Sequence, residues 1–154
     1  MISIKPHHFI DIITSFGDGI ESFPVHPYGH AVHTVAALIL DDPITFLVME
    51  VGVDDICAPC MHNHDGVCDD TIDTSYRPDA PPMKQDWNLL IDRRWCKRLN
   101  IMQGDRLTAR SFCELLRDTN PDITDIYREI PEHRTAKRSR KLFAGVEKYL
   151  VLSE

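Results

Sequence analysis

The chain has 154 residues, of which 43% are hydrophobic and 27% are charged, and this composition argues against wholesale disorder. Its length suits one domain, which we expect to span residues 1–154. The formal net charge of −7 argues against a nucleic-acid partner held by bulk charge, and no apolar run approaches the ~20 residues that cross a bilayer. The N-terminus lacks the features of a signal peptide. We therefore expect a cytoplasmic protein without membrane contact, whose thiols stay reduced unless they bind metal or take part in redox chemistry.

The first third of the chain predicts two helices and two strands. Ile2 to Ile4 is expected to form a short strand, and Pro6 can open a helix whose apolar residues recur from His7 to Phe16. A second helix is expected from Tyr28 to Leu40, where apolar residues again recur at helical spacing. Ile44 to Val51 is rich in β-branched and aromatic residues, which predicts a buried strand leading into a cysteine-rich loop.

The remainder predicts three further helices. Thr71 to Tyr76 is a candidate second short strand, and Met83 to Leu99 has the apolar face of an amphipathic helix. Thr108 is a candidate N-cap of the next helix, and Pro131 opens the last one. The sum is a mainly α fold with a small β element (α+β), with about five helices and one or two short strands beside the cysteine-rich loop.

The cysteine-rich loop is the strongest functional signal. Cys57, Cys60 and Cys68 lie within a dozen residues, and the turn formers Pro59 and Gly66 between them predict a loop that folds back on itself. A C-x-x-C pair with a third nearby thiol is a typical metal-binding pattern. Five cysteines cannot pair completely as disulfides within one chain. We therefore predict a single metal-binding domain.

The loop is one ligand short of a closed site. A structural zinc usually has four ligands, and a cubane iron–sulfur cluster usually has four cysteines. The candidates for the fourth ligand are His62, His64, Cys96, Cys113, Asp11 and the N-terminal histidines. Cys96 and Cys113 lie beside apolar residues of helices, which favours a buried core position for both.

Two groups of histidines extend the list of candidates. His7 and His8 precede Asp11 by four and three positions, so a helix places one or both next to the carboxylate. This arrangement suits proton transfer, and His7 and His8 are candidate catalytic residues. A second series at i, i+4 and i+7 consists of His26, His30 and His33. A helix would align them as a second wall of the pocket or as a separate metal site, and the competing interpretation is that they are ordinary residues of an amphipathic helix.

Positive charge concentrates near the C-terminus. The cations are Arg134, Lys137, Arg138, Arg140, Lys141 and Lys148. A solvated helix face is the leading interpretation, because apolar residues recur on the other side of the helix. A phosphate-bearing substrate, an acidic partner or a nucleic acid is the alternative.

Three segments carry a family resemblance. Lys5-Pro-His-His-Phe-Ile-Asp11 resembles the opening R-P-H-H-L-L-C, and Asp54-Asp-Ile-Cys-Ala-Pro-Cys60 with Gly66-Val-Cys68 resembles D-D-I-C-x-x-C and a later cysteine. The segment from Asp92 to Gly104 resembles a helix end of the form D-x-x-V-L-x-x-L-G-L-x-x-G. Residues 2 to 118 thus resemble a family of small bacterial and archaeal proteins catalogued as domain of unknown function 1284.

The resemblance implies a fourth cysteine where this chain has Asp11. An oxygen ligand at that position is more exchangeable than a thiolate, or it leaves one coordination position free. The leading hypothesis is therefore a 4Fe–4S cluster on Cys57, Cys60 and Cys68, with Asp11 or a substrate at the fourth position.

Such a centre predicts an iron–sulfur lyase that removes water or sulfide from a small polar substrate, with His7 or His8 transferring protons. One alternative is a zinc-stabilised binding module. Another is an iron–sulfur accessory protein that carries electrons or clusters for a redox partner. A homo-oligomer is compatible with each of these hypotheses.

Overall fold

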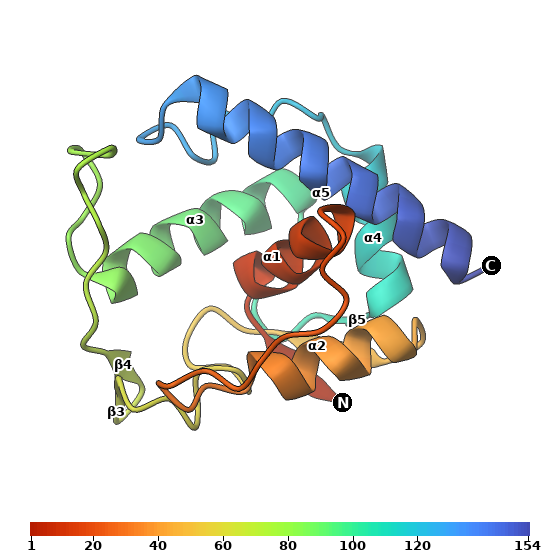
Figure 1. Ribbon diagram of the computed structural model, residues 1–154, viewed down its shortest axis with the longest axis horizontal. Helices are drawn as coiled ribbons and strands as arrows, with labels where there is room; N and C mark the ends of the chain where they lie inside the picture. The colour runs from red at the N-terminus through yellow and green to blue at the C-terminus, as the bar shows by residue number, and fades with distance from the viewer.

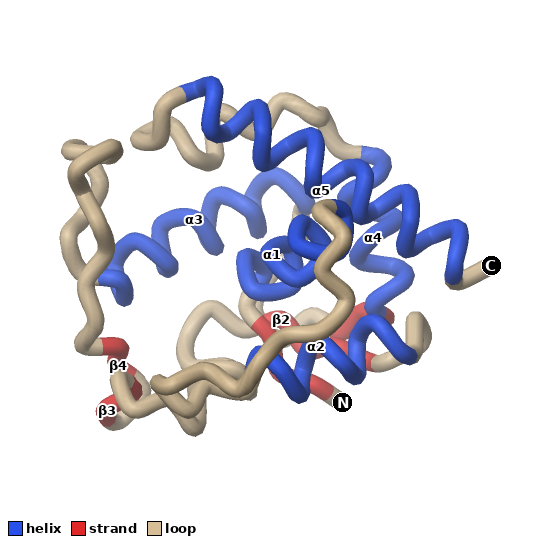
Figure 2. Tube along the Cα trace, viewed as in Figure 1, coloured by secondary structure: helices blue, strands red, loops and turns tan.

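The computed structural model describes residues 1–154 and confirms the mainly helical fold with small β elements (Figures 1 and 2). Its helices are α1 (Pro6–Gly17), α2 (Val32–Asp41), α3 (Lys84–Leu99), α4 (Ala109–Asp118) and α5 (Glu132–Leu152). Its strands are β1 (Ile2–Ile4), β2 (Phe46–Met49), β3 (Asn63–His64), β4 (Val67–Cys68) and β5 (Arg106–Thr108). None of the helices combines the length and the apolar character that a membrane crossing requires.

A small sheet joins the N-terminus to the middle of the chain. Strand β2 lies between β1, to which it is parallel, and β5, to which it is antiparallel. Ile2 and Ile4 of β1 and Leu47 and Met49 of β2 are buried, whereas the residues between them are more exposed. This alternation is typical of a sheet with one face on the core.

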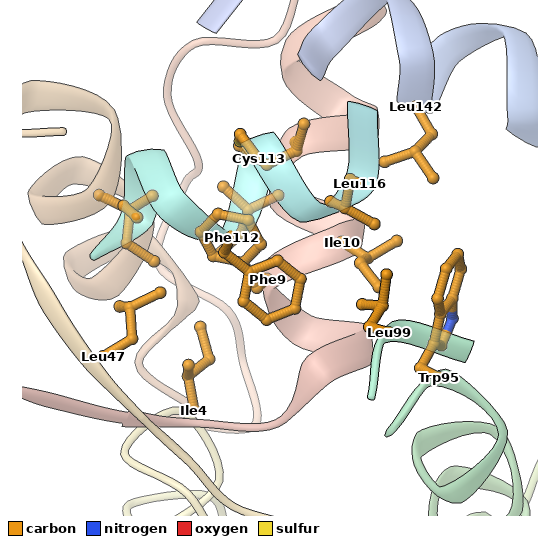
Figure 3. Packing of buried hydrophobic residues seen from close by; sticks show 14 of the residues in the cluster. Ile4, Phe9, Ile10, Leu47, Trp95, Leu99, Phe112, Cys113, Leu116 and Leu142 are labelled. Atoms are coloured by element: carbon orange, nitrogen blue, oxygen red, sulfur yellow. The ribbon is translucent and has the colours of Figure 1, made fainter. Parts of the chain in front are cut away.

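Helix α1 is the centre of the hydrophobic core (Figure 3). Its side chains Phe9 and Ile10 point toward residues of α3, α4 and α5, among them Phe112 and Leu142. The rings of Phe9 and Phe112 lie 4.3 Å apart between centroids. The apolar residues of α1 form a wide buried face that packs on the core. His8, Asp11 and Ser15 lie on the remaining face and are partly exposed.

Two glycines let α1 and α5 cross at close range. A Cβ atom on Gly17 would lie 1.9 Å from the carbonyl oxygen of Lys141, and one on Gly145 would lie 2.0 Å from that of Ile13. Both distances are far below van der Waals contact, so the crossing requires glycine at both positions.

We predict that Gly145→Ala destabilises the protein. Overpacking against a backbone costs about 1–3 kcal/mol, which outweighs the ~1 kcal/mol that alanine gains in helix propensity. Urea denaturation of Gly145→Ala and of the control Glu147→Ala, at an exposed position of α5, measures the difference. Equal stability of the two variants would contradict the close crossing.

Most sequence-predicted elements are present, with three corrections. Helix α2 begins at Val32 and not at Tyr28, because Gly29 has a φ of 74° and the Ala31 amide bonds to Ile56 in the cysteine-rich loop. Thr71 to Tyr76 is not a strand and makes only an isolated bridge between Thr71 and Met83. Strands β3, β4 and β5 are not predicted from the sequence, since two or three residues are too few to show an alternating pattern.

Candidate metal centre

The cysteine-rich loop is attached to the N-terminal segment by backbone hydrogen bonds. Asp55 donates its amide to the carbonyl oxygen of Ser3 over 3.0 Å, and its carboxylate accepts the Ser3 amide over 2.9 Å. Ile56 is buried at 3% exposure and anchors the same stretch in the core. The loop therefore starts from a defined position beside β1 and α1.

Asp54 is the polar centre of this attachment. Its carboxylate, at 1% exposure, accepts the Lys5 amide at 2.8 Å, the Cys57 amide at 3.0 Å and Nδ1 of His8 at 2.6 Å. Burial opposes ionisation of this carboxyl, but the hydrogen bonds from His8 and the two amides hold the pKa of Asp54 well below its usual range. One ionised carboxylate thus joins the start of α1, the first cysteine and His8.

His8 and Lys5 both approach Cys57. Burial and the neighbouring His7 ring lower the pKa of His8, but Asp54 and Cys57 raise it above its ordinary value. The Lys5 ammonium lies 3.7 Å from Sγ of Cys57. A cation beside a sulfur balances part of the negative charge that thiolates bring to a metal.

A tight hairpin places Cys68 near the C-x-x-C pair. Asp65 and Gly66 have φ values of 51° and 89°, which is the left-handed conformation of a two-residue hairpin turn. The turn pairs Asn63 with Cys68 across β3 and β4. Gln85 of α3 accepts the Cys68 amide at 2.8 Å and holds the end of the hairpin against the helix.

All three cysteines line one cavity of ≈ 200 Å³. The lining side chains of types that can bind metal include Cys57, Cys60, Cys68, His8, Asp11, His30 and His62. Because a single water needs only about 10–15 Å³ measured in the same way, the cavity has room for more than one ion. The loop, α1 and the segment before α2 therefore form a common site.

The structure separates the two N-terminal histidines. His7 is buried at 5% exposure, and both its amide and Nδ1 lie 2.8 Å from the Asp92 carboxylate of α3. It is not among the residues that line the cavity, whereas His8 is. Asp11 lines the cavity too, and its half-exposed carboxylate is 2.8 Å from Nη1 of Arg138.

The other histidines do not share one helix face. His26 and His30 precede α2, and their rings stack with centroids 4.2 Å apart. Nδ1 of His30 is buried without a hydrogen-bond partner in the protein. In the hairpin, His62 and His64 both contact the Asp69 carboxylate, at 2.7 Å and 2.9 Å.

Three donor atoms are already close enough to share one ion. The ligand atoms of His8, Asp54 and Cys57 lie within 4.8 Å of one another. Both Asp54 oxygens are already occupied by hydrogen bonds, so we assign Asp54 to orienting His8, as carboxylates commonly do for metal-binding histidines. Because Nδ1 of His8 is bonded to Asp54, Nε2 is the nitrogen that remains for a metal ion.

Sequence reasoning missed the roles of Asp54 and Asp92. Asp54 lies three residues before Cys57, the spacing at which an aspartate caps the following turn, and this was the available signal. Asp92 lies on α3 next to the buried Ile91, where an unpaired carboxylate would be costly. Its partner His7 is 85 positions away, so no local pattern reveals the pair.

Chemically, this group can bind a soft metal or activate a thiol. Cys57, His8 and Asp54 have the order of a nucleophile, its base and the carboxylate that orients the base. Cys60 and Cys68 have no part in that chemistry, yet they line the same cavity. A metal in this cavity would have all three thiols as candidate ligands, so metal binding accounts for more of the lining than an activated thiol does.

Comparisons with models of known protein families, with curated proteins and with solved structures found no match.

We predict that alkylation distinguishes two classes of thiol. Burial raises the pKa of Cys96 to about 11 and that of Cys113 further, and only the thiolate reacts. In metal-free protein near pH 8, Cys57, Cys60 and Cys68 should react with iodoacetamide at least about tenfold faster, as measured by peptide mass spectrometry. Metal should then protect those three alone. Equal rates for Cys96 and Cys60 would contradict the assignment.

We predict a pH-dependent contribution of the His7–Asp92 pair to stability. Burial alone would lower the pKa of His7, but Asp92 raises it above its ordinary value. A raised histidine pKa adds stability that is complete below the unfolded-state value of about 6.5 and is lost as pH rises through the folded-state value. Asp92→Asn should therefore lose about 1–3 kcal/mol at pH 6 and less at pH 9.

Urea denaturation of chelator-treated protein measures this difference. Asp86→Asn, at an exposed position in the first turn of α3, is the matched control and should differ little from the wild type. A loss for Asp92→Asn that grows with pH would contradict the pairing.

Proposed function

We propose that the chain binds an iron–sulfur cluster in the cavity of the cysteine-rich loop and acts as a lyase on a small polar substrate. The observation that carries the proposal is that Cys57, Cys60 and Cys68 line one cavity with His8, whose Nδ1 is held by Asp54. The resemblance of three motifs to the family catalogued as domain of unknown function 1284 supports the same proposal.

The donor set fits a cluster better than a single closed ion. Three thiols from one loop are soft ligands that iron–sulfur clusters prefer. The cavity volume of ≈ 200 Å³ leaves room for more than one ion. The fourth position falls to Asp11, to Nε2 of His8 or to the substrate. Asp11 is already paired with Arg138, which favours an exchangeable position over a permanent carboxylate ligand.

The residues of this chain would supply binding and proton transfer. When bound, a cluster with an exchangeable position supplies a Lewis acid for the leaving group. His8 lines the cavity, and Asp54 bonds to Nδ1 of its ring, so Nε2 is the nitrogen that would give or take a proton. His7 is turned toward Asp92 and packs against His8 with ring centroids 4.2 Å apart, so we assign it to positioning His8.

Cysteine variants of anaerobically purified protein test the proposal. The wild type should contain iron and acid-labile sulfide, and each of Cys57→Ser, Cys60→Ser and Cys68→Ser should lose most of both. Cys96→Ser and Cys113→Ser are the matched controls and should keep them. Retention of iron and sulfide in all three loop variants would overturn the proposal.

Asp11→Cys tests the exchangeable position. A fourth thiolate should slow the loss of visible absorption in air, because the cluster would then be closed by four cysteines. Asp18→Cys, on the turn after α1, is the control and should leave the rate unchanged. An equal rate for Asp11→Cys and the wild type would place the open position elsewhere.

A second candidate is a zinc-stabilised binding module. It is favoured by the donor atoms of His8 and Cys57, which already lie within the spacing of a single ion. A colourless protein with about one zinc per chain that unfolds on chelation would select this candidate.

A further inference from the structure

A second cleft of ≈ 510 Å³ lies beside the metal cavity, between α1 and α5. Its cations are Arg134, Lys137, Arg138 and Lys141, four of the six that the sequence gathers near the C-terminus. They are spaced at i, i+3, i+4 and i+7 and so occupy one face of α5. Asp11 and Ser15 of α1 line both this cleft and the metal cavity, which makes the two sites neighbours with a shared wall.

The cations in the cleft exceed the carboxylates that pair with them. Arg138 pairs with Asp11 at 2.8 Å, and Lys141 pairs with Asp18 at 3.0 Å. Arg134 and Lys137 form no ion pair within the protein. Like charges at i and i+4 on a helix repel each other, and Arg134 with Arg138 and Lys137 with Lys141 have this spacing. Only two of these four cations are neutralised by a carboxylate.

Uncharged side chains in the cleft orient one of the cations and supply further hydrogen-bonding groups. The guanidinium of Arg134 lies 4.1 Å from the centre of the Tyr76 ring, which restricts its orientation. Ser15 and Tyr76, which line the cleft, carry hydroxyl groups, whereas the Thr14 hydroxyl already donates to the carbonyl oxygen of Ile10 at 2.7 Å. Guanidinium, ammonium and hydroxyl donors around one concave site are the groups that recognise phosphate.

We propose that this cleft binds the phosphate-like dianionic group of a small molecule, whose remainder extends past Asp11 and Ser15 into the metal cavity. The two unpaired cations match the two negative charges of such a group. The assignment of this molecule as the substrate rests on the proposed function, whereas anion binding itself does not. The cleft therefore indicates that the polar substrate proposed for the metal site carries an anionic group.

Titration with inorganic phosphate at constant ionic strength tests the proposal, followed by calorimetry and by amide resonances. Phosphate should bind more tightly than acetate and should shift the resonances of Thr14 and Ser15. Lys137→Gln should weaken phosphate binding about tenfold, because one charged hydrogen bond is lost. Arg140→Gln is the matched control, since Arg140 lies on α5 outside the cleft, and should change affinity less than about twofold.

Several outcomes would overturn the proposal. They are absence of phosphate binding, equal binding of acetate, equal losses in Lys137→Gln and Arg140→Gln, and binding of a single-stranded oligonucleotide but not of phosphate. Because Lys137 is exposed and forms no ion pair, unfolding is not expected in this variant, and circular dichroism checks this directly.

Chelator-treated protein keeps this test separate from the test of the metal site. Phosphate binding by protein that never takes up metal would support the anion cleft while the proposed function fails. Metal uptake without phosphate binding would do the reverse and overturn the cleft alone.

Discussion

One buried carboxylate determines where the cysteine-rich loop lies. Asp54 accepts hydrogen bonds from the amides of Lys5 and Cys57 and from the ring of His8, and it stays ionised in a nearly inaccessible position. A buried carboxylate without these hydrogen bonds would be costly. Folding of the loop therefore requires that Lys5, His8 and Cys57 all lie next to Asp54. The first cysteine and the histidine beside it are thus positioned by the same group.

Helix α1 connects this group to the rest of the molecule. Its apolar face packs among α3, α4 and α5 (Figure 3). His8 lines the cysteine-lined cavity, and Asp11 and Ser15 line both that cavity and the basic cleft. The close crossing at Gly17 and Gly145 brings the basic face of α5 next to Asp11. The core packing of α1 therefore bears on the site, because it leaves Asp11 and Ser15 as a wall shared by the cysteine-lined cavity and the basic cleft.

The helices could be predicted because their signals are local. Apolar spacing predicted α1 and α3, and the Thr108 side chain does accept the Ser111 amide at 3.0 Å at the start of α4. The start of α2 could not be predicted, since the amide of Ala31 is held by Ile56 from a distant loop. The same holds for β5, whose three residues become a strand only by pairing with β2.

Only part of the candidate site could be predicted from the sequence. The spacing of the three cysteines predicted one common site, and all three line one cavity. The pairing of His8 with Asp54 and of His7 with Asp92 could not be predicted, because it depends on contacts across 46 and 85 positions. The basic residues near the C-terminus are predicted to form a solvated face, and Arg134, Lys137 and Arg140 are exposed. That Lys137 also lines a cleft could not be predicted, because α1 and α5 are far apart in the sequence.

X-ray absorption at the metal edge of anaerobically purified protein tests the central claim most directly. For an iron–sulfur cluster on Cys57, Cys60 and Cys68, we expect sulfur atoms to dominate the nearest neighbours of the metal and a second metal atom to be detectable beyond them. A metal surrounded only by nitrogen and oxygen would contradict it, because Cys57, Cys60 and Cys68 would then have no part in the centre.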